Sequence, residues 1–260
     1  MTTHSRFRPL ALAMSSALLL GLSSVAAAQE APRGPAAAPA VTPRAQAVLD
    51  RMTNYLRSLQ TFSISADSSR DEVLAEGYKL QHNEHSELTV QRPNKLRAEL
   101  RGDLRTRTIV YDGEKLSMYS PDDAAYVRVA TVDNLANLIG SLLDAGVEMP
   151  MIDVLYQGAV GNLTQYVNGG AVVGESVIDG VPCDHLAFRQ SNVDWQLWVQ
   201  KGEQALPRKI VITTRYEVGD PQYQVTMDWN LKPKVSDATF KFTAPANASE
   251  VALVAGDSSK

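Results

Sequence analysis

The residues of this chain best suited to chemistry lie in the stretch GVPCDHLAF, residues 180–188. The stretch holds the only cysteine, Cys183, followed directly by Asp184 and His185. A thiol beside a histidine base can form a cysteine nucleophile, and the same residue types also bind metal ions. Whether the three side chains can meet depends on the element that carries them.

Alternation along a strand separates the three side chains. Asp179-Gly180 is a hairpin signal, so a strand follows in which successive side chains point to opposite faces. Cys183 and His185 then share one face, whereas Asp184 lies on the other and cannot orient the histidine. No oxyanion-hole signature or nucleophile turn accompanies the Cys–His pair, and free cysteine commonly behaves as a small buried hydrophobe. We therefore expect a structural pair and no catalytic residue.

A second polar cluster, HNEH, contains His82 and His85. Their three-residue spacing places them on opposite faces of a strand, which disfavours a shared metal ion and favours a solvated, polar edge strand. In the predicted strands and helices, the sequence also lacks a Gly-rich phosphate-binding loop, the H-E-x-x-H motif of zinc proteases and the G-x-S-x-G motif of serine hydrolases. The sequence therefore indicates no metal and no cofactor.

The first residues of the chain resemble an export signal. Arg6 and Arg8 precede an apolar run over residues 10–22, and small residues follow at 26–28. This pattern predicts a cleavable signal peptide over residues 1–28, whose apolar run is too short for a membrane span. With no twin-arginine pair and no cysteine after the cleavage site, we expect a soluble periplasmic protein without a lipid anchor.

Composition defines the expected domain organisation. Residues 29–43, rich in Ala and Pro, predict a flexible tether, followed by a single domain over 44–254 and a disordered tail over 255–260. The formal net charge of -4 comes from interspersed acids and bases, which excludes the basic stripe of a nucleic-acid-binding protein. We expect a monomer.

Apolar residues at helical spacing predict an N-terminal helix and helices in the middle of the chain. The first helix has its apolar face at Val48, Met52, Leu56 and Leu59. The first middle helix has its apolar face at Leu135, Leu138, Ile139, Leu142 and Leu143, with Asp133 as its N-cap and Gly146 as the residue that ends it. A second short middle helix is expected from Pro150, and Met149 and Met151 beside it form either a lid or a gap filler.

Strand patterns fill the rest of the chain, with turns such as Asp112-Gly113 and Asp179-Gly180 between runs of β-branched and aromatic residues. The order helix, meander, helices, meander predicts an α+β fold with one antiparallel sheet. A sheet of about ten strands coils into a barrel or half-barrel, and the helices then cover its concave side and enclose an apolar pocket. In VDWQLWV, Trp195 shares a face with Leu197 opposite Trp198, so Trp195 packs in the core or contacts a ligand.

Several segments resemble known families. RPNKLRAEL and IVYDGEKLSMYSPDDAAYVRV resemble the R-P and V-x-D-G-x-x-L-W-x-Y-x-P segments of the periplasmic lipoprotein carriers of the LolA and LolB type. LDRMTNYLRSLQTFSISADSS and FKFTAPANASEV resemble the beginning and end of those carriers. GVPCDHLAFRQSNVDWQLWV with ALPRKIVITTR resembles, more specifically, a family of predicted periplasmic proteins of unassigned function in the same superfamily. The likeness covers nearly all of residues 44–254.

The resemblance implies a strongly curved, incomplete antiparallel barrel that is closed by helices and holds acyl chains in an apolar cavity. In the carriers, the Arg before the Pro of the R-P motif hydrogen-bonds the lid helices, and by position this is Arg92 here. The chain departs from the carriers at Ser117, where they have Trp, and in its second meander.

Together these observations favour a non-enzymatic periplasmic binding or carrier protein for a lipid or a lipidated apolar ligand. Burial of an acyl chain gives affinity without a precise polar site, at about 0.8 kcal/mol per methylene. The candidate cavity and lid residues are Arg92, Leu135, Ile139, Leu142, Met149, Met151 and Trp195. The alternatives are an envelope interaction or scaffold module without cargo and, third, an enzyme based on Cys183.

Overall fold

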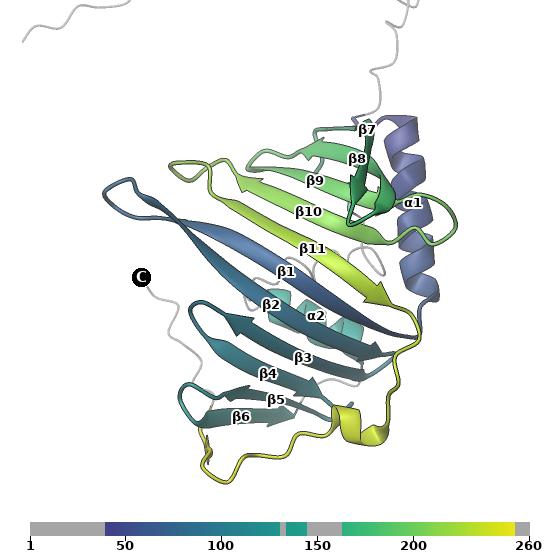
Figure 1. Cartoon of the computed structure of the whole chain (residues 1–260). Helices are drawn as coiled ribbons and strands as arrows, with labels where there is room; N and C mark the ends of the chain where they lie inside the picture. The colour runs from purple at the N-terminus through teal and green to yellow at the C-terminus, as the bar shows by residue number, and fades with distance from the viewer. Residues whose placement is uncertain (1–39, 131–133, 145–162, 253–260) are drawn as a thin grey trace, which may run out of the picture. The chain divides into compact units, whose positions relative to one another are not determined.

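The computed structural model describes residues 40–130, 134–144 and 163–252 (Figure 1). The elements of the first half are α1 (Pro43–Ser58), β1 (Thr61–Val73), β2 (Lys79–Gln91), β3 (Lys95–Gly102), β4 (Thr106–Tyr111), β5 (Lys115–Ser120), β6 (Ala125–Ala130) and α2 (Leu135–Asp144). Those of the second half are β7 (Gly169–Ile178), β8 (Val181–Arg189), β9 (Val193–Gln200), β10 (Pro207–Thr214), β11 (Gln222–Asn230), a 3-10 turn (Asp237–Phe240) and β12 (Ser249–Glu250).

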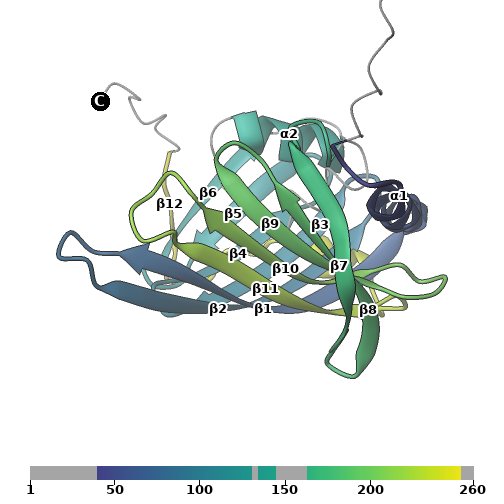
Figure 2. The same ribbon diagram turned by 90° about the horizontal axis from the view of Figure 1, so that it is seen from above.

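The strands form one twelve-stranded sheet in the order β12-β6-β5-β4-β3-β2-β1-β11-β10-β9-β8-β7. Two meanders meet at its centre, where β11 pairs with β1 and places Ile64 opposite Trp229 and Ala66 opposite Met227. Neighbouring strands are antiparallel, and the short β12 adds a parallel pairing to β6. The sheet curves strongly and stays open, since β7 and β12 are its two ends (Figure 2). The predicted α+β fold with a curved antiparallel sheet is confirmed.

The two faces of the sheet differ in polarity. On β1, Phe62, Ile64 and Ala66 are buried, whereas Ser65 and Asp67 between and beyond them point to the other face. We call the side of Phe62, Ile64 and Ala66 the inner face and the opposite side the outer face. The inner face carries an apolar cluster that extends through both meanders, because strand alternation places one apolar set on a single side.

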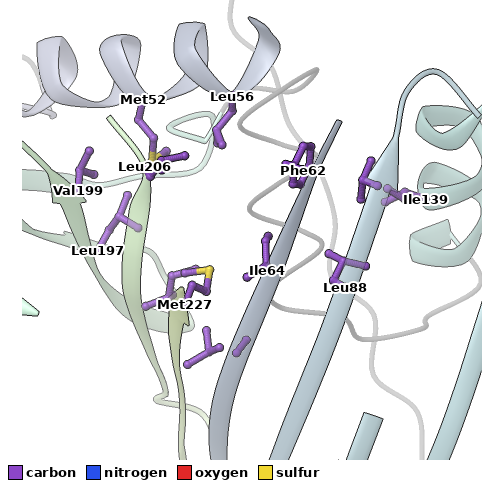
Figure 3. Packing of buried hydrophobic residues seen from close by; sticks show 14 of the residues in the cluster. Met52, Leu56, Phe62, Ile64, Leu88, Ile139, Leu197, Val199, Leu206 and Met227 are labelled. Carbon is purple, nitrogen blue, oxygen red and sulfur yellow. The ribbon is translucent and has the colours of Figure 1, made fainter. Parts of the chain in front are cut away.

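The helix α1 forms where its sequence predicts. Thr42 caps it by accepting a hydrogen bond from the Ala45 amide through its hydroxyl oxygen (3.4 Å), and Pro43 occupies the first turn. Its buried face consists of Ala45, Val48, Leu49, Met52 and Leu56. Figure 3 shows Met52 and Leu56 directed toward the side chains of the sheet. The amphipathic pattern therefore places α1 on the apolar cluster.

The second helix, α2, is capped one residue later than the sequence predicts. The Asn137 amide donates to the side-chain oxygen of Asn134 (2.8 Å), which makes Asn134 the N-cap in place of the expected Asp133. Leu135, Leu138 and Ile139 are buried in the apolar cluster, as their spacing predicts. Asp133, the expected stop at Gly146 and the second middle helix from Pro150 lie outside the described residues, as do the predicted signal peptide, most of the tether and the tail.

Candidate functional site

The three residues of the Cys-Asp-His segment lie on β8 and alternate between faces as predicted. Asp184 pairs in register with Val199 on the inner face, and His185 with Trp198 on the outer face. The guanidinium of Arg51 on α1 donates from Nη2 to Asp184 Oδ2 at 2.9 Å. Asp184 thus fastens α1 to the sheet and takes no part in orienting His185.

Cys183 is buried completely, although it lies on the outer face of its strand. Its Sγ donates to the Val181 carbonyl oxygen at 3.4 Å. Burial raises the pKa of the thiol above its ordinary value, against a smaller opposing effect of the positive charge of Arg208. A buried, protonated thiol lacks the accessible thiolate that nucleophilic catalysis requires.

His185 has a stacking role on the outer face. Its ring lies 4.1 Å from that of Trp198 at an interplanar angle of 10°, and Nε2 lies 3.0 Å from Gln196 Oε1. The ammonium group of Lys209 lies 5.5 Å from the centroid of the Trp198 ring. Cation, indole and imidazole therefore form a ladder across β10, β9 and β8, which fits the expected structural role of His185.

The HNEH cluster distributes its histidines over different carboxylates. His82 contacts Glu72 at 2.7 Å, while His85 contacts Asp67 at 2.7 Å and Glu87 at 3.1 Å. The hydrogen bond to Asp67 and then that to Glu87 raise the pKa of His85 above its ordinary value. Among the described residues, no group of three His, Cys, Asp or Glu side chains is arranged to hold a metal ion.

The prediction of an edge strand is wrong for β2 as a whole, because β2 lies between β1 and β3. The ladder between β2 and β3 begins only at Glu84, so His82 and Asn83 lie beyond it. His85 pairs with Asp67 on one side and with Arg101 on the other. The strand is nevertheless polar at this end, since its outer side chains face solvent and its charges pair across the strands. The polar composition resembles that of an edge strand although the strand is internal.

On the inner face, β8 and β9 contribute an aromatic pair. The rings of Phe188 and Trp195 lie 4.0 Å apart at 18°, and Trp195 is only 8% exposed. Leu197, next on the same face, is buried as well, so the predicted division between Trp195 with Leu197 and Trp198 opposite is confirmed. Among the candidate residues, Trp195 therefore lies in the same apolar cluster as Leu135 and Ile139 of α2.

The R-P segment contacts α2 through its backbone. The Pro93 carbonyl oxygen accepts a hydrogen bond from the Leu135 amide at 2.9 Å, and the Arg92 amide donates to the Gln60 carbonyl at 2.8 Å. The described attachment of α2 is therefore made by the residue after Arg92, and the role of the Arg92 side chain stays a prediction. Burial lowers the pKa of the Arg92 guanidinium below its ordinary value.

The remaining candidate residues fall into two groups. Leu135 and Ile139 are each 8% exposed, and Leu138, at 5%, belongs to the same face but was not among the candidates. The helical spacing that predicted α2 would also have identified Leu138. The side chain of Leu142 and the residues Met149 and Met151 lie outside the described part of the chain.

A groove of about 360 Å³ runs beside α1, where the sequence predicted no site. It is lined by Gln46, Leu49, Asp50, Thr53, Asn54, Arg57, Leu163 and Thr164. Most of these side chains are polar and come from the solvent side of α1. Such a lining suits water and polar groups, so this groove is distinct from the apolar pocket predicted on the inner face.

Comparison with known proteins identifies one family. The family model described as "Predicted periplasmic protein (DUF2092)" matches residues 45–254, which confirms the family predicted from the sequence. A search of curated proteins gave no significant match. No helix among the described residues is long and apolar enough to cross a membrane.

Several solved structures are similar to the chain at low sequence identity. An uncharacterized conserved protein from Thermus thermophilus is 14% identical, with a TM-score of 0.47, and the match covers 80% of this chain and 98% of that one. LprF from Mycobacterium bovis is 12% identical, with a TM-score of 0.46, over 81% and 100% of the two chains. A LolA superfamily protein from Nitrosomonas europaea is 12% identical, with a TM-score of 0.34, over 76% and 97%.

Proposed function

Because the chain belongs to this family of predicted periplasmic proteins, we propose that it is a periplasmic, non-enzymatic carrier or binding protein for a lipid or a lipidated apolar ligand. The ligand lies between the inner face of the sheet and the helices that cover it. The observation that carries the proposal is the continuity of the apolar inner face across both meanders and onto α1 and α2.

The contacts of α2 suit a cover that an apolar ligand can displace. Leu135, Leu138 and Ile139 contribute its buried face, while a backbone hydrogen bond from Leu135 to Pro93 holds its first residue. An acyl chain that packs between these side chains and the sheet keeps the apolar face of α2 covered. Each methylene that it buries contributes about 0.8 kcal/mol.

The chemistry of the outer face supports a role without catalysis. Cys183 is inaccessible and its thiol has a raised pKa, and His185 is stacked on Trp198. Neither group is placed to activate a substrate. The functional surface of the molecule is therefore the apolar inner face.

A second candidate is an envelope interaction module that uses the same fold without cargo. It is favoured by the deep burial of Leu135, Leu138 and Ile139, which pack in the apolar cluster of the sheet. In this case the partner would be a protein of the cell envelope, and the apolar cluster would serve stability alone.

Lipid extraction distinguishes the two candidates. The mature protein is purified from the periplasm in native buffer, extracted with organic solvent and analysed by mass spectrometry, and a delipidated sample is tested for thermal stabilisation by palmitate. The carrier proposal predicts co-purified amphiphile and a rise in Tm with palmitate, by mass action. Absence of both, together with a crosslinked envelope protein, would establish the interaction module instead.

A matched pair of variants locates the ligand. Ile139→Asn places a polar side chain in the buried face of α2, whereas Val173→Asn changes a side chain that is 55% exposed on β7. The first variant should lose the stabilisation by palmitate and the second should retain it. Equal retention in both would place the ligand away from α2.

A further inference from the structure

Among the described residues, Trp195 carries a buried hydrogen-bond donor on the inner face that has no acceptor. The indole Nε1 of Trp195 is buried and makes no hydrogen bond to any part of the chain that the structure describes, and the whole residue is only 8% exposed. The indole N–H can donate but cannot accept, so it requires an acceptor in its surroundings. Its neighbours in register on β8 and β10 are Phe188 and Ile212, whose side chains offer none.

A second indole on the inner face, that of Trp229, makes its hydrogen bond within the fold. Trp229 lies on β11, and its Nε1 donates to the Pro207 carbonyl oxygen at 2.8 Å. The ring of Trp229 also contacts Phe62 at 5.5 Å between centroids. The Trp229 N–H therefore has an acceptor within the fold, whereas the Trp195 N–H is available to a ligand.

The Trp195 ring is held in place by a series of close contacts. Gly170 hydrogen-bonds to the chain just before α1, through the amide of Gly170 to the Ala40 carbonyl and the amide of Thr42 to the Gly170 carbonyl, both at 2.9 Å. A Cβ at Gly170 would come within 2.4 Å of the Phe188 ring, so the glycine leaves the space into which Phe188 fits. Phe188 in turn stacks on Trp195 at 4.0 Å.

These contacts fix a donor in an apolar environment, where an unsatisfied polar group is costly. The cost disappears when an oxygen atom of a ligand accepts the hydrogen bond. A plain hydrocarbon cannot do this, whereas the carbonyl oxygen of an acyl ester or a fatty acid can. An unpaired N–H at this position favours an apolar chain that carries a hydrogen-bond acceptor, and an acyl carbonyl is such an acceptor.

We infer that the Trp195 N–H binds the carbonyl oxygen of an acyl ligand on the inner face of the sheet. The inference rests on the proposed lipid-binding function and specifies its ligand class as acyl compounds, with the chain on the apolar cluster and the carbonyl at Trp195. Trp195 is a specificity residue in this arrangement, since the chain itself binds through apolar contact.

The test compares two neutral probes of near-equal length, methyl laurate and pentadecane, so that charge does not contribute. Delipidated full-length mature protein is equilibrated with each probe, and the bound fraction is measured by gas chromatography. The variants are Trp195→Phe, which keeps an aromatic ring against Phe188 but removes the donor, and Trp198→Phe on the outer face of the same strand. Trp198→Phe is the matched control for loss of an indole.

Trp195→Phe should weaken the binding of methyl laurate about three- to tenfold, the effect of one hydrogen bond, and should leave pentadecane binding within about twofold. Trp198→Phe should change neither. The infrared carbonyl band of bound methyl laurate should lie at lower frequency in the wild-type protein than in Trp195→Phe, because hydrogen bonding weakens the C=O bond.

Three results would contradict the inference, and they are distinguishable. Equal weakening of both probes by Trp195→Phe shows that the ring acts through packing alone. If Trp195→Phe binds both probes with the affinity of the wild type, and the carbonyl band of bound methyl laurate has the same frequency in the two proteins, the indole makes no hydrogen bond to the ligand. Failure of the wild-type protein to bind either probe overturns the proposed function itself.

Discussion

The inner and outer faces of β8, β9 and β10 are built from alternate residues of the same segments, yet most of their side chains make different kinds of contact. On the inner face Leu186, Leu197 and Ile210 join the apolar cluster. On the outer face His185, Trp198 and Lys209 form a ladder that is open to solvent in part. The difference teaches that residues adjacent in sequence belong to separate environments, so a sequence cluster such as Cys-Asp-His is not a spatial cluster.

The largest expected difference between the two faces is in stability. Leu197→Ala removes a side chain that is 1% exposed, and the cavity should lower the free energy of unfolding by about 2–5 kcal/mol. Gln196→Ala, one residue earlier and on the outer face, loses its contact with His185 and should cost about 1 kcal/mol. Urea unfolding followed by circular dichroism measures both. Equal losses would show that the faces are not energetically distinct.

Cys183 is the exception among the outer-face residues, because it lies on the outer face and is nevertheless 0% exposed. Its thiol should react with iodoacetamide on the order of a hundredfold more slowly in the folded protein than in urea, since burial raises its pKa and reaction requires local opening. Mass spectrometry of the alkylated fraction over time gives the rates.

The control for Cys183 is a cysteine at an exposed position of the β8–β9 turn. In the Cys183→Ser background, Asn192→Cys should react at a rate similar to that of the unfolded chain, because residue 192 is exposed. Rapid alkylation of Cys183 in the folded protein would contradict its structural role and would support the alternative of an enzyme based on this thiol.

The ion pair between Arg51 and Asp184 joins α1 to the inner face, and its removal should have a smaller effect. The Asp184 side chain is 9% exposed and that of Arg51 is 40% exposed. Arg51→Met leaves a nearly buried carboxylate without its partner and should cost about 1–2 kcal/mol. The double variant Arg51→Met with Asp184→Leu should recover part of this loss, as measured by urea unfolding. Strictly additive losses would show that the two side chains are not coupled.

The smallest effect is expected on the outer face of β2, where His85 lies between Asp67 and Glu87. Because these contacts raise the pKa in the folded state, their stabilising effect is complete below the ordinary pKa of about 6.5 and is lost as pH rises through the raised value. Since the group is exposed to solvent, the effect should be only a few tenths of a kcal/mol.

The measurement for His85 is the free energy of unfolding of the wild type and of His85→Gln at pH 5.5 and pH 8. The wild type should exceed the variant by more at pH 5.5 than at pH 8. A difference that grows with pH would reverse the sign of the proposed interaction, and the same difference at both values would show that the contacts do not depend on protonation of the histidine.

The sequence by itself determined the features that depend on local periodicity. The twofold period of a strand separated Asp184 from His185 and Trp195 from Trp198, and the 3.6-residue period of a helix identified the buried face of α1. These predictions were correct because backbone geometry fixes the direction of successive side chains whatever the strand pairs with. The order of helices and meanders likewise indicated a curved antiparallel sheet.

Tertiary structure alone decided which distant residues meet. The pairing of β1 with β11 and the contact between Arg51 and Asp184 join segments far apart in the chain. So does the attachment of α2 through the Leu135 amide to the Pro93 carbonyl oxygen. Such contacts follow from the burial of the whole apolar surface at once, and no local pattern encodes them. The same reason explains why the sequence could name Trp195 as a candidate, while only the fold shows that the described residues offer its indole N–H no acceptor.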